Sequence, residues 1–169
     1  MKSKMIAGLV VLVFALAVSA YAQAPTYVGS GKCQICHKTE KQGQQYPIWE
    51  KSNHSKAFAA LSSPGAAANA QALGVKDPTT DAQCLKCHGA VAEFKTEGVT
   101  CEVCHGAGSD YKSLSVMKSK EEAVKKGLKL LEGPEAIKTW CLTCHKDAHG
   151  KTFDFAASWD KIKHPIPAK

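Results

Sequence analysis

The sequence predicts a mainly α-helical protein built of helices and loops, and three observations lead to this fold class. Apolar residues recur at helical spacing from Trp49 to Leu61 and again from Phe153 to Ile162. A capping box stands at Ser119-Lys120-Glu121-Glu122, and Gly133 and Pro134 mark the end of one helix and the start of the next. No stretch of the sequence shows the run of β-branched and aromatic residues typical of strands.

Three elements are predicted in the first half of the chain. A helix runs from Glu50 to Leu61 and carries His54 on the same face as its apolar residues. A helix of small residues follows from Ala66 to Leu73 and ends at Gly74. The segment from Asp77 to Asp81 reads as a turn.

Further helices are predicted in the second half. Ser119 opens a helix that continues to about Leu131, and Pro134 begins the next one. The aromatic and aliphatic residues from 153 to 162 mark a closing amphipathic helix. We expect it to end at His164, because the following proline disfavours helical backbone at the residue before it.

Four C-x-x-C-H motifs lie along the chain and contain all of its eight cysteines. C-x-x-C-H is the attachment signal for c-type haem: two cysteines on one side of a helical turn form thioethers, and the adjacent histidine binds the iron. Zinc sites and redox cysteine pairs also use C-x-x-C, but neither requires a histidine directly after each pair. The sequence therefore predicts four covalently bound haem c groups, attached through Cys33, Cys36, Cys84, Cys87, Cys101, Cys104, Cys141 and Cys144 and ligated by His37, His88, His105 and His145.

The spacing of the motifs and their glycine-rich flanks predict how the haems are packed. Cys84 and Cys101 are only 17 residues apart, so we expect the second and third haems to lie close together. Glycines at 89, 98, 106 and 108 suit a backbone that lies against a porphyrin face, where a side chain would collide.

Residues 1–22 are predicted to be a secretory signal peptide. Lys2 and Lys4 precede an apolar run that is short for a transmembrane span, and Ala20-Tyr21-Ala22 is a cleavage site, with Ala22-Gln23-Ala24 as an alternative. An uncleaved membrane anchor is the competing interpretation. We expect one periplasmic tetrahaem domain at residues 23–169, soluble after cleavage, whose few large apolar side chains leave the haems to supply most of the buried surface.

The chain is basic, with a formal net charge of +7, yet it contains no arginine. Scattered lysines without arginine argue against nucleic acid as a partner. The haem propionates also bring the mature protein close to neutrality. We expect the lysines to solvate the surface and to steer acidic redox partner proteins, such as other periplasmic or membrane-bound cytochromes.

Four further residues of the mature chain are candidates for the second axial position of each iron. His54 and His164 are predicted to be ligands. His149 is too near His145 to reach the far side of the same haem, so a surface position is favoured for it. Met117, the only methionine after the signal peptide, is either a ligand or a packed core residue.

In these features the chain resembles the tetrahaem cytochrome c-554 family. The resemblance depends on the order of the four motifs, the run Gly98-Val99-Thr100 before the third, Cys104-His105-Gly106-x-Gly108, the W-x-x-S-x-H element ending at His54, and a closing Phe153-x-Phe155 helix ending in His164. The resemblance implies a mostly helical fold with haems in closely packed pairs that relay electrons in the periplasm.

The resemblance also implies an axial ligand set. Three haems of that family have two histidine ligands and one is five-coordinate. By this resemblance His54 is the sixth ligand of the third haem, His164 that of the fourth, and the His88 haem is the open one. Met117 lies near the place where the family supplies a histidine to the first haem, which leads to the hypothesis that Met117 ligates the His37 haem.

An electron carrier, rather than an enzyme, is the function that the sequence favours. Closely spaced haems pass electrons without a substrate site, and the cysteines and most histidines are committed to haem. One alternative is an enzyme that reduces or oxidises nitric oxide, nitrite or hydroxylamine at an open haem. Another is a subunit of a haem wire or larger complex.

Overall fold

The computed structural model describes residues 23–146 and 148–166, and within them the chain consists of helices and loops without a strand. This confirms the predicted mainly α class. The predicted signal peptide, residues 1–22, lies outside the described residues. The helices are α1 Ser30–His37, α2 Gln45–Lys51, α3 Ala57–Ala60, α4 Pro64–Ala72, α5 Ala82–His88, α6 Cys101–His105, α7 Leu114–Met117, α8 Lys120–Lys125, α9 Pro134–His145 and α10 Phe155–Ile162, with short 3-10 segments η1 Glu40–Gln42, η2 Ala92–Glu97 and η3 Ala148–Gly150.

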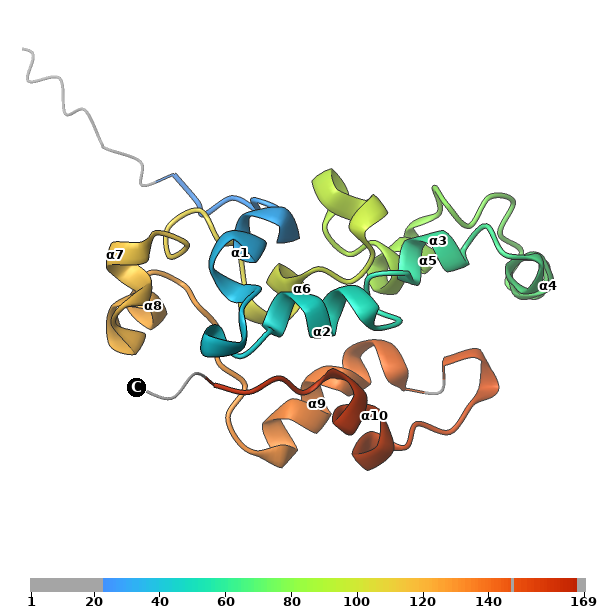
Figure 1. Cartoon of the computed structure of the whole chain (residues 1–169). Coiled ribbons are helices and arrows are strands. Elements are labelled where there is room, and N and C mark those ends of the chain that lie inside the picture. The colour runs from blue at the N-terminus through green and yellow to red at the C-terminus, as the bar shows by residue number, and fades with distance from the viewer. Residues whose placement is uncertain (1–22, 147, 167–169) are drawn as a thin grey trace, which may run out of the picture.

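The helices are short, and long loops join them (Figure 1). In that view the orange and red ribbons of α9 and α10 lie below α2, while α7 with α8 and α4 lie at opposite ends of the molecule. No helix in the described part of the chain is long and apolar enough to cross a membrane.

All four C-x-x-C-H motifs end a helix. The motif histidine is the last residue of α1, α5, α6 and α9. Asp81 caps the start of α5 by accepting a hydrogen bond from the backbone N–H of Gln83, and Pro134 is the first residue of α9. Each cysteine pair therefore lies on the last turn of its helix, where residues three apart share one side.

The predicted helix from Glu50 to Leu61 was wrong. Helix α2 ends at Lys51, α3 begins at Ala57, and His54 lies in the loop between them. The hydroxyl of Ser52 donates to the carbonyl of Trp49 at 2.7 Å, and backbone position 52 is extended. Serine side chains that bond to nearby backbone carbonyls compete with the helical ladder, so the helix stops here.

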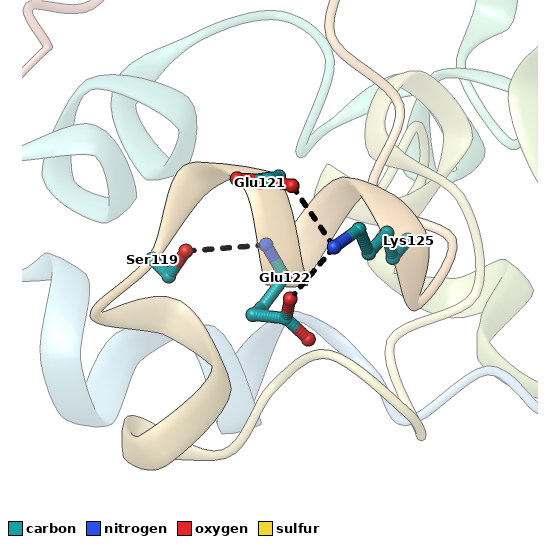
Figure 2. A network of polar contacts seen from close by, with 4 residues as sticks. All are labelled: Ser119, Glu121, Glu122 and Lys125. Carbon is teal, nitrogen blue, oxygen red and sulfur yellow. Dashed lines mark hydrogen bonds and ion pairs between the residues drawn. The ribbon is translucent and has the colours of Figure 1, made fainter.

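Ser119 caps α8, as the sequence predicted. Its hydroxyl accepts from the backbone N–H of Glu122 at 3.2 Å, while the carboxylates of Glu121 and Glu122 pair with Lys125 (Figure 2). The capping interaction is one-sided, because the Glu122 side chain bonds Lys125 and not the Ser119 backbone.

The predicted end of this helix at Leu131 was too late. Helix α8 stops at Lys125, because Gly127 has a left-handed backbone (φ 99°) and Leu128 N–H reaches back to the carbonyl of Ala123 at 2.9 Å. Gly133, which was expected to cap the end of α8, instead precedes the first residue of α9.

Three other boundaries also differ from expectation. Pro64 begins α4 at its first position, where proline is well tolerated. Helix α10 ends at Ile162, so His164 lies in an extended segment beyond it. Met117, which the sequence left outside any helix, is the last residue of α7.

The apolar core of the polypeptide is small. Its buried hydrophobic residues within the described chain are Leu61, Ala70, Val75, Val91, Tyr111 and Ala123. Several large apolar side chains, among them Leu114 and Ile35, are exposed. So few buried side chains in a chain of this length agree with the expectation that bound groups supply apolar surface.

Candidate metal centres

Three pairs of imidazole rings lie close together, with interplanar angles of 39° and 42° in two pairs and 67° in the third, and they use six of the seven histidines. Each pair joins a motif histidine to a histidine from another part of the chain. The ring centroids are 6.1 Å apart for His145 and His54, 6.0 Å for His88 and His149, and 6.0 Å for His105 and His164.

This common spacing is that of two imidazoles on one metal ion. A bond from a metal to an imidazole nitrogen is about 2 Å long, and the nitrogen lies roughly 1 Å from the ring centre, so two rings that share a metal have centroids about 6 Å apart. A haem iron takes two axial ligands on opposite faces of the porphyrin, and histidine is a common one. The donor set and its spacing therefore fit a haem iron with two histidine ligands at three of the four motifs.

Hydrogen bonds fix the ring orientation of three motif histidines. The Nδ1–H of His88 donates to the carbonyl of Ala57 at 2.8 Å, and that of His105 donates to the carbonyl of Lys129 at 3.0 Å. The Nδ1–H of His37 donates to Oε1 of Gln45 at 3.3 Å. A proton held on Nδ1 leaves Nε2 unprotonated, which is the form that binds a metal.

Burial favours the neutral, metal-binding form of three rings. The pKa of His54 lies below its usual value because the ring is desolvated and His145 is near. Desolvation, with His88 near, lowers the pKa of His145, and desolvation followed by the neighbouring His105 lowers that of His164. The His145 ring also stacks on Phe153, with centroids 4.6 Å apart.

The histidines that lie opposite His54 and His164 differ from those that the family resemblance implies. His54 faces His145 of the fourth motif instead of His105 of the third, and His164 faces His105 instead of His145. The backbone of His54 is nevertheless held by the segment before the third motif, because Val99 N–H donates to its carbonyl at 2.9 Å. The indole N–H of Trp49 donates to the carbonyl of Val99 at 2.7 Å and completes this attachment.

The side chain of His149 is exposed, which agrees with the surface position that the sequence favoured. Its ring faces His88 of the second motif. Its closeness to His145 in sequence keeps it from the far face of that haem but leaves the haem of another motif within reach. The count of histidines, three beyond the four motifs, was the signal that pointed to three pairs.

The cysteines show which motifs are neighbours. Cys33 and Cys101 lie within hydrogen-bond reach, which is the main reason that the pKa of the Cys33 thiol is raised. Cys87 has a pKa raised to about 11 by burial and then by a hydrogen bond with Cys144. These effects place the first motif near the third and the second near the fourth, and the closeness of the second and third haems stays a prediction.

Two predicted site residues have less defined surroundings. His37 has no histidine ring opposite it among the described residues. Met117 is half-buried at the end of α7, and α7 packs mainly on α8. Nothing in the described contacts joins Met117 to His37, so its role as a ligand stays a hypothesis.

Glu102, inside the third motif, is a buried residue of the site region that the sequence did not single out. Its side chain is 1% exposed and accepts hydrogen bonds from the backbone N–H groups of Val28, Gly29 and Gly108. The carboxylate thereby joins the chain before the first motif to the chain after the third. The x positions of a C-x-x-C-H motif carry no pattern that predicts such a contact.

Comparison with known proteins gives one match. Residues 32–106 match the family model described as cytochrome c554 and c-prime. This segment contains the first three C-x-x-C-H motifs, the Trp49 to His54 element and Glu102. Searches of curated proteins and of solved structures found no match.

Proposed function

Since the chain belongs to the c554-type cytochromes through residues 32–106, we propose that it is a periplasmic electron carrier with four c-type haems. The observation that carries this proposal is the set of three histidine pairs with a common spacing of 6.0–6.1 Å, each built on a motif histidine. When bound, haem iron supplies a reversible one-electron couple at each site.

The residues of the chain hold these sites rigid and adjust their electronic properties. Histidines from distant segments would hold the iron, and the hydrogen bonds from Nδ1 of His37, His88 and His105 would set how strongly each ring donates to it. Rigid ligands reduce the reorganisation that accompanies a change of iron charge. This arrangement supports a carrier, which must gain and lose electrons without changing shape.

Neighbouring motifs support a relay through the whole molecule. Helix α1 packs on α6, and Cys101 contributes to the raised pKa of Cys33 as Cys144 does to that of Cys87. Burial raises the pKa of Cys104 to about 11 although a hydrogen bond from Trp140 lowers it, and Cys141 is close enough to raise it further. The first motif is thus linked to the third, the third to the fourth and the fourth to the second, so that no site is isolated.

The partners are proposed to be other redox proteins with acidic docking surfaces. The net positive charge of the polypeptide comes entirely from lysine, which is suited to steering and not to tight bidentate binding. Electron transfer with an acidic partner is then expected to slow as ionic strength rises.

Haem content and electron count test the proposed function. The protein purified from the periplasm should have the mass of a chain beginning at Gln23 with four haems, and a spectroscopic redox titration should take up four electrons per chain reversibly. A variant with Cys141→Ala and Cys144→Ala is the matched control and should lose one haem and one electron. Fewer than four haems in the unaltered protein, or bound zinc, would contradict the proposal.

An enzymatic role at an open haem is the second candidate. It is favoured by one observation, that seven histidines provide three pairs and leave one motif histidine without a second ring. An iron with a vacant axial position can bind nitric oxide, nitrite or hydroxylamine. The substrate would bind where that position lies.

A further inference from the structure

We propose that His149 is the second axial ligand of the haem held by Cys84, Cys87 and His88, so that the exchangeable axial position of this chain lies on the His37 haem. This inference rests on the proposed function, because it requires haem at both motifs. It departs from the ligand set of the resembling family, in which the second haem is the open one.

The first support is geometric. The His88 and His149 rings have centroids 6.0 Å apart, the same separation as in the His105–His164 pair and within 0.1 Å of the His54–His145 pair. The ring separation that identifies the other two pairs as axial ligands of one iron therefore identifies the His88–His149 pair as well. The Nδ1–H of His88 is engaged by the carbonyl of Ala57, so its free nitrogen is the other one.

The second support is the backbone of His149. Its φ of 55° and ψ of 30° place it in the left-handed region, and one other non-glycine residue among those described, Gln44, has a positive φ. Such a conformation is costly for a residue with a side chain and persists only where surrounding interactions impose it. A bond from the imidazole to a metal held by the second motif is an interaction of that kind.

The third support is the position of the fourth motif. Helix α9 ends at His145 and η3 begins at Ala148, so His149 lies on the turn that follows the fourth motif, with its ring 6.0 Å from that of His88. His149 is close to its own motif histidine in sequence, but the fold directs it to the neighbouring motif. The proximity argument that excluded it from the His145 haem therefore does not apply.

The first motif is left with an open position. His37 is oriented by Gln45, whose side-chain N–H donates in turn to the carbonyl of Pro165 at 3.0 Å. His164 is the nearest candidate in this region, but its ring is paired with His105. No other histidine remains in the chain. The position opposite His37 would accept a small neutral ligand such as carbon monoxide or nitric oxide when the iron is reduced.

Carbon monoxide stoichiometry tests the assignment of His149. The reduced holoprotein should bind one carbon monoxide per chain, and His149→Gly should bind two and gain one high-spin ferric haem. Glycine is the substitution of choice because it accepts the left-handed backbone, and added imidazole should return the variant to one carbon monoxide per chain. Lys151→Ala, an exposed neighbour, is the control and should leave the stoichiometry at one.

Resonance Raman spectra of the reduced protein test the position of the open site. Gln45→Leu removes the hydrogen-bond acceptor from Nδ1 of His37, and it should lower the iron–histidine stretching frequency of the five-coordinate haem. An unchanged frequency would place the open site elsewhere and overturn this part of the inference.

The outcomes separate this inference from the proposed function. Four haems with equal carbon monoxide binding in His149→Gly and the unaltered protein would overturn the assignment of His149 alone. No carbon monoxide binding by the unaltered protein, together with a near-infrared band that Met117→His abolishes, would show that Met117 occupies the His37 haem and would overturn the open position. Fewer than four haems would contradict the proposed function itself.

Discussion

A single buried carboxylate joins two distant parts of this protein. Glu102 accepts backbone N–H groups from Val28 and Gly29 at one end of the described chain and from Gly108 after the third motif. Its distances to the last two, 2.8 and 2.7 Å, are those of charge-assisted hydrogen bonds. A charged acceptor is suited to this position because several donors converge on two oxygens.

Replacing this carboxylate should destabilise the holoprotein. Glu102→Gln keeps the shape but offers one acceptor oxygen and turns an NH2 group toward backbone donors. We expect a loss of about 2–3 kcal/mol in the free energy of unfolding, since hydrogen bonds to charged groups contribute about 1.5–3 kcal/mol.

Denaturant unfolding followed by far-UV circular dichroism measures this loss. The control is Glu121→Gln on the exposed face of α8, whose ion pair with Lys125 lies in solvent and should contribute less than about 1 kcal/mol. Equal stability of the two variants would show that the bonds to Glu102 contribute little.

Helix ends were predictable from sequence where their cause is local. Ser119 and Pro134 open α8 and α9 because capping and proline chemistry act within one turn. The break before His54 was not predictable from periodicity. Ser52 interrupts the ladder, and the loop is held by Val99, which is 45 residues away along the chain. Tertiary contacts override local pattern at the loop that carries a candidate ligand.

The loop that presents His54 should depend on a glycine. Gly98 has φ 76°, and a Cβ there would overlap with the carbonyl oxygen of His54. Gly98→Ala should therefore cost more than about 1 kcal/mol of stability and displace His54, so that one low-spin haem becomes high-spin.

Electron paramagnetic resonance of the ferric protein and thermal unfolding give the two readouts for Gly98. Gly65→Ala in α4 is the matched control, because a Cβ at that position has open space around it and alanine favours a helix. It should leave the spin states unchanged and raise stability slightly. A fully low-spin Gly98→Ala protein would mean that the close approach to His54 is not required.

At the scale of the whole molecule, the motif histidines were predictable and the ring pairs were not. A C-x-x-C-H motif consists of five consecutive residues, whereas the pair His54–His145 joins residues from opposite halves of the chain. The resemblance to a family proposed partners for His54 and His164, but the structure exchanges them. Pairing is decided by where the loop of His54 and the segment of His164 lie relative to α9 and α6, and a pattern along one chain does not contain that information.

The small polypeptide core leads to a prediction about the chain without haem. Ordering one residue costs roughly 1–2 kcal/mol of backbone entropy, and folding offsets this mainly by burying apolar surface. Few side chains are buried in the described residues, and three of the fully buried ones, Ser30, Thr100 and Glu102, are polar. Within the described polypeptide the hydroxyls of Ser30 and Thr100 have no hydrogen-bond partner, so their burial adds a cost.

A variant with all eight cysteines changed to alanine, which cannot form thioethers, should therefore lose its cooperative unfolding transition and most of its helical circular dichroism signal. The holoprotein is the reference in the same buffer. The Cys141→Ala, Cys144→Ala variant provides a graded intermediate, because α9 would lose its bound group while α1, α5 and α6 keep theirs. A haem-free variant that unfolds cooperatively with native helix content would show that the polypeptide core alone stabilises the fold. The haems would then bind to a structure that forms without them.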